Sequence, residues 1–384
     1  MIYLDNAATT FPKPSAVTES IRLCMQEYCG NPGRGAHKLS LKAAEKVFEC
    51  RETAAEMFGA AGADRVFFTP NATFGINAVI KGLLKRGDHV LISDMEHNAV
   101  WRPIHKLAEQ GLIEYGIFKT FSAEPRPSPR RICAELERAL KPNTRLVICL
   151  HASNICSAVL PIGAIGELCR RRGVLFAVDG AQSAGHEHIS VEDMGITALC
   201  LPGHKGLYGP QGSGMVVLKR DVILDTLTEG GNGVDSLSPH MPETSPERYE
   251  AGTLSVPCIA GLLEGMKAVR KAGISAIARK EAELCGRISY MLGNTRGITL
   301  YGNGNRGNIV LFNIDGMPSE RTAEELDRRG ICVRAGYHCA GLAHSTLGTA
   351  EGGAVRVSVG MFNRLSDAEA LYSAIADIMK VSAG

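Results

Sequence analysis

Short apolar runs alternate with amphipathic stretches between about residues 65 and 220. Several of the apolar runs have no polar face, which is typical of strands buried in a mostly parallel sheet between helices. The candidate strands are RVFFTP, HVLIS, RLVICLHAS, VLFAVDG, ALCLPG and GMVVLK. After the first of them, apolar residues at helical spacing predict one buried helix face, made of Ile76, Val79, Ile80, Leu83 and Leu84. This alternation predicts a doubly wound α/β domain.

The pattern changes after Val256-Pro257. A helical segment over about 258–292 is followed by a mixed order of elements: strands ITLYG and NIVLFNI, helix SERTAEELDRRG, and strands CVRAG and AVRVSVGMF. The last helix is expected to open with SDAE, where Ser366 and Glu369 have the spacing of a capping box. We therefore expect a smaller α+β domain here. The proline-rich stretch EPRPSPRR, residues 124–131, is interpreted as a surface loop, because strands and helices resume on both sides of it.

Charge and composition narrow the class of protein. The 42 basic and 40 acidic side chains give a net charge of +2, so no broad field favours nucleic acid or an anionic membrane as a partner. The N-terminus MIYLDNAATT lacks the pattern of an export signal, and no apolar run approaches the ~18 residues of a membrane span. The 12 cysteines form no CxxC pair, and most lie in apolar runs as small buried side chains. A cytoplasmic location is the expectation.

One glycine motif suggests a nucleotide site. GNGNRG, residues 302–307, matches GxGxxG, which binds a dinucleotide only where the glycines lead from a strand into a helix. Here they lead into NIVLFNI, a predicted strand. We expect a hairpin or loop connection instead.

Three other positions have both a chemical and a structural interpretation. In TPNATFG, residues 69–75, Thr73 lies at a helix start that suits a phosphate group, or simply serves as an N-terminal cap. Asp179 ends a buried strand, at the edge where open α/β sheets bind ligands, or caps the next helix. Lys205 lies among glycines in PGHKGLYG, where a desolvated amine could form a covalent adduct, although the local pattern by itself favours a solvated loop lysine.

Cys339, in RAGYHCAGLAH, has three interpretations. Arg334, His338 and His344 nearby could favour the thiolate and make it a nucleophile. The thiol could also be buried and inert. A zinc site that combines Cys339 with His338 and either His344 or the distant His37 is a weak match, because zinc prefers compact ligand pairs, and no metal is predicted.

The order of these motifs along the chain is more informative than any one of them. The phosphate-type loop, DMEHNA, HASN, AVDGAQ, GHK and AVRVS occur in the order found in pyridoxal-phosphate enzymes of aminotransferase class V. The chain most resembles the cysteine desulfurase family, from YLDNAATT to VRVSVGMFN. The short RAGYHCAGLAH resembles the SUF-type branch and selenocysteine lyases. In many relatives a serine precedes GHK, where this chain has Pro202.

The resemblance implies a fold and a domain division. The fold is pyridoxal-phosphate fold type I, with a mostly parallel seven-stranded sheet between helices and a smaller α+β C-terminal domain. Residues 16–256 would form the large cofactor domain. Residues 257–384, joined by the N-terminal segment 1–15, would form the small domain that carries the Cys339 loop.

The resemblance also implies a role for each matching residue. Lys205 would hold pyridoxal 5'-phosphate covalently and then move the substrate's α proton, and Asp179 would pair with the ring nitrogen. The other expected roles are ring stacking by His97, contacts to the phenolic oxygen and substrate by Gln182 and Asn154, phosphate binding by Ala72, Thr73 and His204, and substrate carboxylate binding by Arg356.

The implied reaction converts L-cysteine to L-alanine and leaves a persulfide on Cys339, as in sulfur mobilisation for iron–sulfur cluster assembly. A homodimer is expected, because Thr253 in YEAGT would reach the phosphate of the neighbouring subunit. A dedicated sulfur-acceptor protein is a further expected partner. The alternatives are a selenocysteine lyase acting on L-selenocysteine, and a class V lyase, epimerase or aminotransferase that does not use Cys339.

Overall fold

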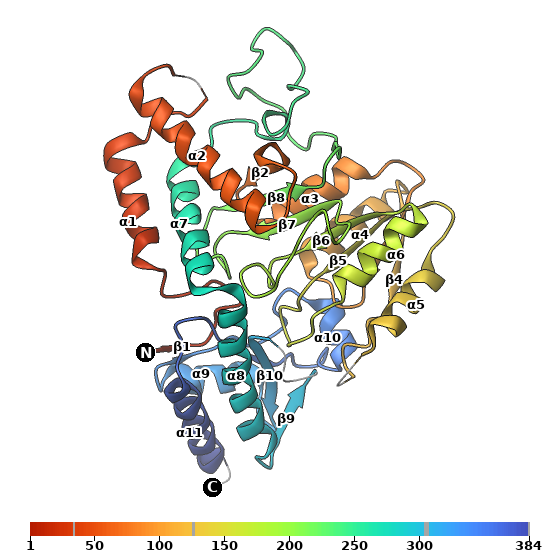
Figure 1. Cartoon of the computed structure of the whole chain (residues 1–384). Helices are drawn as coiled ribbons and strands as arrows, with labels where there is room; N and C mark the ends of the chain where they lie inside the picture. The colour runs from red at the N-terminus through yellow and green to blue at the C-terminus, as the bar shows by residue number, and fades with distance from the viewer. Residues whose placement is uncertain (34, 125–126, 303–306, 383–384) are drawn as a thin grey trace.

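A computed structural model describes residues 1–33, 35–124, 127–302 and 307–382. Residues 125–126 of EPRPSPRR and 303–306 of GNGNRG therefore lie outside the described residues. The described part of the chain forms three sheets: a larger one of seven strands in the upper part of Figure 1 and, below it and near both termini, one of three strands and one of two. Within the described residues, no helix is long and apolar enough to cross a membrane.

The larger sheet has seven strands in the order β2-β8-β7-β6-β5-β3-β4. Its strands are β2 (Val66–Thr69), β3 (His89–Ser93), β4 (Glu114–Phe118), β5 (Thr144–Leu150), β6 (Leu175–Asp179), β7 (Ala198–Pro202) and β8 (Gly214–Leu218). β8 runs antiparallel to its neighbours β2 and β7, whereas the other adjacent strands are parallel. The predicted mostly parallel seven-stranded sheet is thus confirmed.

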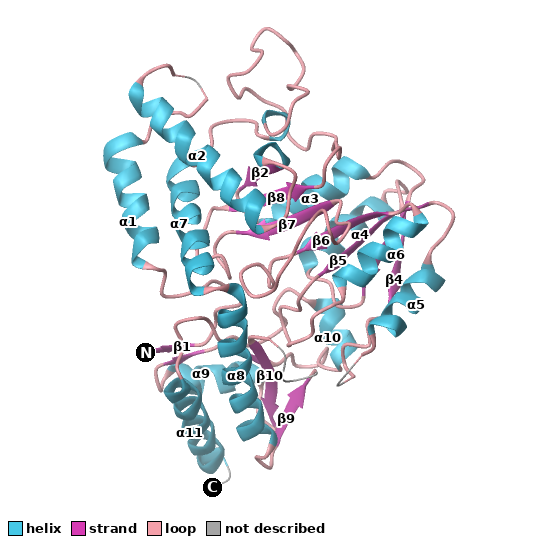
Figure 2. Cartoon of the chain, in the orientation of Figure 1, coloured by secondary structure: helices cyan, strands magenta, loops and turns pink. Residues whose placement is uncertain are grey.

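Helices cover both faces of this sheet, as Figure 2 shows. One face packs against α2 (Lys38–Met57), α5 (Pro129–Ala139), α6 (Ile162–Arg172) and α7 (Val256–Ala272), and the other against α3 (Ala72–Leu83) and α4 (Asn98–Glu109). α1 (Ser15–Leu23) packs outside, on α7. Short helical turns lie at η1 (Cys24–Tyr28), η2 (Ala63–Arg65) and η3 (Glu247–Tyr249).

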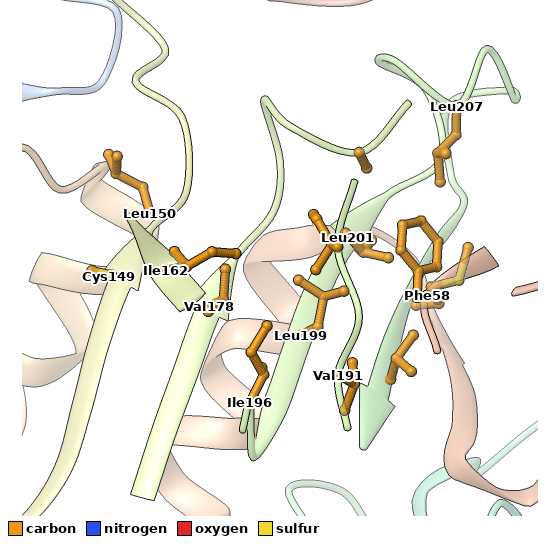
Figure 3. Packing of buried hydrophobic residues seen from close by; sticks show 14 of the residues in the cluster. Phe58, Cys149, Leu150, Ile162, Val178, Val191, Ile196, Leu199, Leu201 and Leu207 are labelled. Atoms are coloured by element: carbon orange, nitrogen blue, oxygen red, sulfur yellow. The ribbon is translucent and has the colours of Figure 1, made fainter. Parts of the chain in front are cut away.

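Side chains alternate between the two faces along each buried strand. In β5, Val147 and Cys149 belong to the core beneath α5 and α6, and Leu146 and Ile148 to the core beneath α3 and α4. Figure 3 shows the first of these cores, with Val178 and Leu199 of neighbouring strands and Ile162 of α6. Because both faces are buried, these strands read as continuous apolar runs, which is why the sequence predicts them. The predicted apolar face of α3 also lies in the core.

The smaller part of the fold is built from antiparallel strands and helices. β10 (Ile309–Ile314) pairs with both β9 (Ile298–Tyr301) and β12 (Val355–Ser358). The N-terminal β1 (Ile2–Tyr3) pairs in parallel with β11 (Ile331–Cys332), so the first residues join this part. Its helices are α8 (Ile274–Gly293), α9 (Ser319–Asp327), α10 (Gly341–Leu347) and α11 (Leu365–Ser382). The domain boundary after residue 256 stays a prediction; α7 packs on α1 and α2, and α8 on β9, β10 and α11.

Five details of the sequence analysis were wrong. β4 was missed, because this edge strand is exposed or half-buried up to Phe118 and does not form an apolar run. The helical segment over 258–292 is two helices, separated at Gly273, whose φ of +83° ends α7. The predicted strand CVRAG is shorter, since β11 ends at Cys332. The stretch EPRPSPRR is not entirely loop, because α5 begins at Pro129.

The predicted capping box of the last helix was the fifth error. α11 already begins at Leu365, so Ser366 lies inside the helix. Asp367 does the capping instead: its Oδ2 accepts from the backbone N–H of Arg364 at 3.0 Å and from Asn363 Nδ2 at 2.9 Å. Asp367 thus plays the part of the acidic residue in a capping box, but no serine or threonine at the cap position completes the box.

Candidate active site

Eight of the predicted site residues meet at one edge of the seven-stranded sheet. β2, β3, β5, β6 and β7 all end there, and the next residues of the chain face a shared cavity. Carboxyl ends of parallel strands meet at the same edge, so residues far apart in sequence come together. The cavity is lined by Asn71, Ala72, Thr73, Ile76, His97, Ala99, Leu150, Ala152, Asn154, Asp179, Ala181, Gln182, Pro202, His204 and Lys205.

Asp179 closes β6 and is only 4% exposed. Its Oδ1 accepts from the backbone N–H of Ala181 at 2.9 Å, so it does cap the following turn. Burial raises its pKa, while that N–H and the nearby cation of Lys205 favour the carboxylate form. Both interpretations of Asp179 thus describe one residue: a capping carboxylate that also faces the cavity.

Lys205 is a half-buried amine rather than a solvated loop lysine. Its pKa is lowered to about 8, mainly by burial and in smaller part by the cations of Arg356 and Arg334, against the opposing charge of Asp179. An amine with this pKa is unprotonated in a substantial fraction near neutral pH, as covalent chemistry with a carbonyl requires.

Close packing fixes the backbone around this lysine. Thr10 Oγ1 donates to the Lys205 carbonyl at 3.0 Å. A Cβ atom at Gly206 would lie 2.2 Å from the Ala184 carbonyl oxygen and 2.4 Å from His186 Nε2. The residue after the lysine must therefore be glycine.

The first turn of α3 forms the anion-binding side of the cavity. Asn71 is the N-cap, and its Oδ1 accepts from the backbone N–H of Phe74 at 2.9 Å. Capping is thus the work of Asn71 rather than Thr73. The N–H groups of Ala72 and Thr73 precede the first intrahelical bonds and lie where the helix dipole favours an anion.

His97 is the N-cap of α4, and its Nδ1 accepts from the backbone N–H of Ala99 at 3.0 Å. Burial and the cation of Lys205 lower the pKa of His97 to about 4, so the ring is neutral with its proton on Nε2. A neutral ring held at one edge can present its flat face to an aromatic ligand.

Several buried polar atoms at this edge have no partner within the described part of the chain. They are Asn154 Oδ1, His204 Nδ1 and Arg356 Nε. Burial lowers the pKa of His204 to about 4, so its ring is neutral. Buried polar groups are normally satisfied, which indicates that a polar molecule completes the site. A helix start at α3 that suits an anion, a carboxylate at the end of β6 and an amine at Lys205 fit the phosphate, ring nitrogen and aldehyde of pyridoxal phosphate.

Gln182 and Asn154 also hold other parts of the chain in place. Gln182 Nε2 donates to the Ala7 carbonyl at 2.9 Å, which joins the cavity to the N-terminal segment. Asn154 Nδ2 donates to the carbonyl of His338 at 2.8 Å, directly before Cys339.

Arg356 lies on β12 and is 2% exposed. It donates to the Asn154 carbonyl at 2.9 Å and to Asp5 Oδ1 at 2.7 Å. The structure therefore places it behind Asn154 rather than in the wall of the Lys205 cavity. Asp5, in the quoted YLDNAATT, is the partner that the sequence analysis missed.

Cys339 is exposed, so the interpretation as a buried inert thiol was wrong. It lies in a tight turn in which the Ala340 N–H donates to the Tyr337 carbonyl at 2.9 Å. His338 and Cys339, the two central residues, have φ of +50° and +56°, a left-handed conformation that costs free energy without glycine. The Asn98 N–H anchors the turn by donating to the Cys339 carbonyl at 2.8 Å.

A buried chain of three side chains supports this turn. Because the Arg334 carbonyl can only accept, His338 Nε2, 3.4 Å away, carries the proton. His338 Nδ1 then accepts from His344 Nε2 at 3.3 Å, and His344 Nδ1 accepts from Thr349 Oγ1 at 2.7 Å. Burial lowers the pKa of both histidines, that of His338 to about 3, so both rings are neutral.

Cys339 lies in the wall of a second hollow, which opens toward α3 and α4 and shares Thr73 and His97 with the first cavity. The thiol thus lies next to the site rather than inside it. Within the described residues, no group of three or more His, Cys, Asp or Glu side chains is arranged to hold a metal ion.

Thr253 is not brought to the cavity of its own chain. It is exposed on the long segment between β8 and α7 and receives a 3.4 Å hydrogen bond from Asn31 Nδ2. It lines a separate hollow with Phe68 and Tyr249.

The chain is similar to known proteins along its whole length. Residues 2–371 match the family aminotransferase class-V. A probable cysteine desulfurase from Methanothermobacter thermautotrophicus is 34% identical, over 98% of this chain and 94% of the relative. A cysteine desulfurase from Synechococcus elongatus is 30% identical over 98% of this chain and 60% of the relative.

Solved structures give the same result. The apo structure of a cysteine desulfurase from Thermococcus onnurineus NA1 superposes with a TM-score of 0.89 at 28% identity, covering 99% of this chain and 94% of that one. The cysteine desulfurase CsdA from Escherichia coli superposes with a TM-score of 0.88 at 25% identity, with coverage of 99% and 94%. The chain therefore belongs to the class V aminotransferase family of pyridoxal-phosphate enzymes, and within that family it is a cysteine desulfurase.

Proposed function

We propose that the chain converts L-cysteine to L-alanine and receives the sulfur on Cys339 as a persulfide. The observation that carries this proposal is the position of Cys339, an exposed thiol on a doubly anchored turn whose hollow shares His97 and Thr73 with the Lys205 cavity. The step balances without an outside oxidant. The Cys339 thiolate bonds to the substrate sulfur, the substrate C–S bond breaks, and a proton completes alanine.

Each residue at the cavity has a task that its surroundings support. Bound pyridoxal phosphate supplies an electron sink next to the substrate's α carbon. Ala72, Thr73 and His204 would hold the phosphate and Asp179 the ring nitrogen. His97 would lie against the ring face. Lys205, with its lowered pKa, would bind the cofactor covalently and move the α proton.

Substrate contacts follow from the polar atoms that lack partners. Asn154 Oδ1 would accept from the substrate or cofactor, and Gln182 would lie beside it. Arg356 would attract the substrate carboxylate. Its Nη2 is already bonded to Asp5, so the carboxylate would bind either at Nε, which has no partner in the described part of the chain, or after the Arg356 side chain has moved. A guanidinium attracts a carboxylate by its charge and also fixes its orientation through paired hydrogen bonds.

The proposed assembly is a homodimer in which the partner subunit's Thr253 completes the phosphate site. Its support is that Thr253 is exposed and does not line the Lys205 cavity of its own chain. If so, mixing an inactive K205A chain with an inactive T253A chain restores part of the activity, because each mixed dimer has one intact site. A monomer would show no such recovery.

A cytoplasmic location and a sulfur-acceptor partner complete the proposal. All 12 cysteines are free, which suits a reducing compartment. The persulfide on an exposed turn must pass its sulfur to an outside thiol before the next turnover.

The decisive experiment mixes the cofactor-loaded protein with L-cysteine in the absence of reductant. We expect alanine in solution and a mass increase of one sulfur atom on the Cys339 peptide, with C339S as the matched control. A shift of the cofactor band without sulfur on Cys339 would overturn the persulfide step. Faster turnover of L-selenocysteine, or activity that survives in C339S, would instead favour one of the alternative activities.

A further inference from the structure

The second hollow has an unusual distribution of charge. Lys81 on α3 and Arg102 and Lys106 on α4 line it together with Cys339, and no Asp or Glu does. All three cations are exposed and have no ion pair or hydrogen-bond acceptor within the described part of the chain. Because the whole chain carries a net charge of only +2, this hollow concentrates positive charge around one thiol.

This hollow is elongated. Its lining follows α4 from Asn98 to Gln110, a distance of about 18 Å at 1.5 Å per residue, with Cys339 at the Asn98 end. One small thiol would contact only a fraction of that length. An extended peptide of about five residues spans it, at 3.3 Å per residue.

We propose that this α3–α4 hollow binds an acidic segment of a protein whose cysteine thiol takes sulfur from Cys339. This inference rests on the proposed function. The acceptor thiolate attacks the outer sulfur of the persulfide, a new S–S bond forms on the acceptor, and the Cys339 thiolate leaves. Carboxylates on either side of the acceptor cysteine lie against Lys81, Arg102 and Lys106, which raises the local concentration of the segment at the turn.

Peptides that form a mixed disulfide with Cys339 test this recognition without any turnover of L-cysteine. Two five-residue peptides carry a central cysteine as a thiopyridine disulfide, flanked by aspartates in one and by lysines in the other. The holoenzyme carries C29S, which removes the other exposed thiol, and mass analysis locates each adduct. An uncharged hydroxyethyl thiopyridine disulfide corrects for the intrinsic reactivity of Cys339.

The acidic peptide is expected to react with Cys339 roughly tenfold faster than the basic peptide at low salt, with the ratio falling toward one as salt screens the charges. K81E/K106E should abolish or invert this preference. The matched control K271E/K380E makes the same change in net charge at exposed positions of α7 and α11 and should keep it.

Equal rates for the two peptides, or a preference that survives K81E/K106E, would overturn the proposal. An equally large preference for a single-residue probe, N-acetylcysteine against its amide, would overturn the peptide partner in favour of a small thiol. A peptide preference without persulfide formation from L-cysteine would refute the proposed function and leave the recognition surface intact.

Discussion

Replacing Asn98 by proline should separate sulfur transfer from cofactor binding. Asn98 is the first residue of α4, a position where proline is well tolerated because its missing N–H has no intrahelical acceptor. His97 before it has φ of −68° and ψ of 151°, which suits a residue preceding proline. The substitution therefore leaves the helix intact and acts on the bond from the Asn98 N–H to the Cys339 carbonyl.

The size of the effect follows from that contact. The lost hydrogen bond is worth about 1 kcal/mol, and the left-handed residues of the turn already cost about 1–2 kcal/mol each. The proline Cδ atom also takes the place of the N–H hydrogen. It would clash with the Cys339 carbonyl oxygen, because that oxygen lies only 2.8 Å from the nitrogen. The turn must retreat by more than about 1 Å, and a displacement of that size costs on the order of 10²-fold in rate.

We therefore expect N98P to form the Cys339 persulfide about 100-fold more slowly, while the change in the cofactor absorbance on adding L-cysteine is preserved. Rapid quenching and mass analysis of the Cys339 peptide measure the first quantity, and hydrogen exchange at Ala340 reports loosening of the turn. N98A, which keeps the N–H, is the control. Equal persulfide rates in N98P and N98A would refute the argument that this anchor positions the thiol.

Three further predictions concern buried groups. T349V removes the hydroxyl that donates to His344 Nδ1. It should lower the free energy of unfolding, measured in urea, by about 1–3 kcal/mol and slow persulfide formation. T349S keeps the hydroxyl and should restore the stability and the rate. Burial raises the pKa of Glu96 to about 8, so the folded state holds a proton that the unfolded state releases above its ordinary pKa. Wild-type stability then falls from about pH 4.5 to pH 8, and the stability of E96Q relative to wild type should rise over that range, by up to about 1.4 kcal/mol per pH unit; a flat difference would contradict the assignment. The rate of pyridoxal-phosphate uptake by the apoprotein should rise through a midpoint near pH 8, as Lys205 loses its proton, and D179N should move that midpoint to lower pH, since the Asp179 charge supports the protonated amine.

Sequence patterns predicted the parts of the fold in which both faces of an element are buried. β5, β6 and β7 each contain an apolar run that is buried on both faces, so the sequence predicts them without a choice between faces. β4 lies at the sheet edge, with one side partly in solvent, and its pattern was too weak to find. The break at Gly273 was missed because apolar residues keep helical spacing on both sides of it.

The candidate site was predictable where a residue follows directly from a strand end. Asp179 and Lys205 are of this kind, and the structure brings both to one cavity. The contacts across the fold were not predictable, because they depend on how the smaller part packs against the larger sheet. The bond from Arg356 to Asp5 and the left-handed turn at Cys339 have no local signal. The sequence analysis named His338 and His344 as neighbours of Cys339, but their role in supporting the turn depends on a third partner, Thr349, that it did not identify.

The burial of the other thiols limits where mobile sulfur can go. Cys149 and Cys200 lie inside the sheet, and burial raises the pKa of each well above that of a free thiol. Protonated and out of reach, they can neither attack a persulfide nor be attacked. Among the 12 cysteines, only Cys29 shares the exposure of Cys339, and it lies at the end of η1. Seven of the 12 thiols are buried in this way, so the sulfur on Cys339 has few acceptors within its own chain, and we expect another molecule to take it.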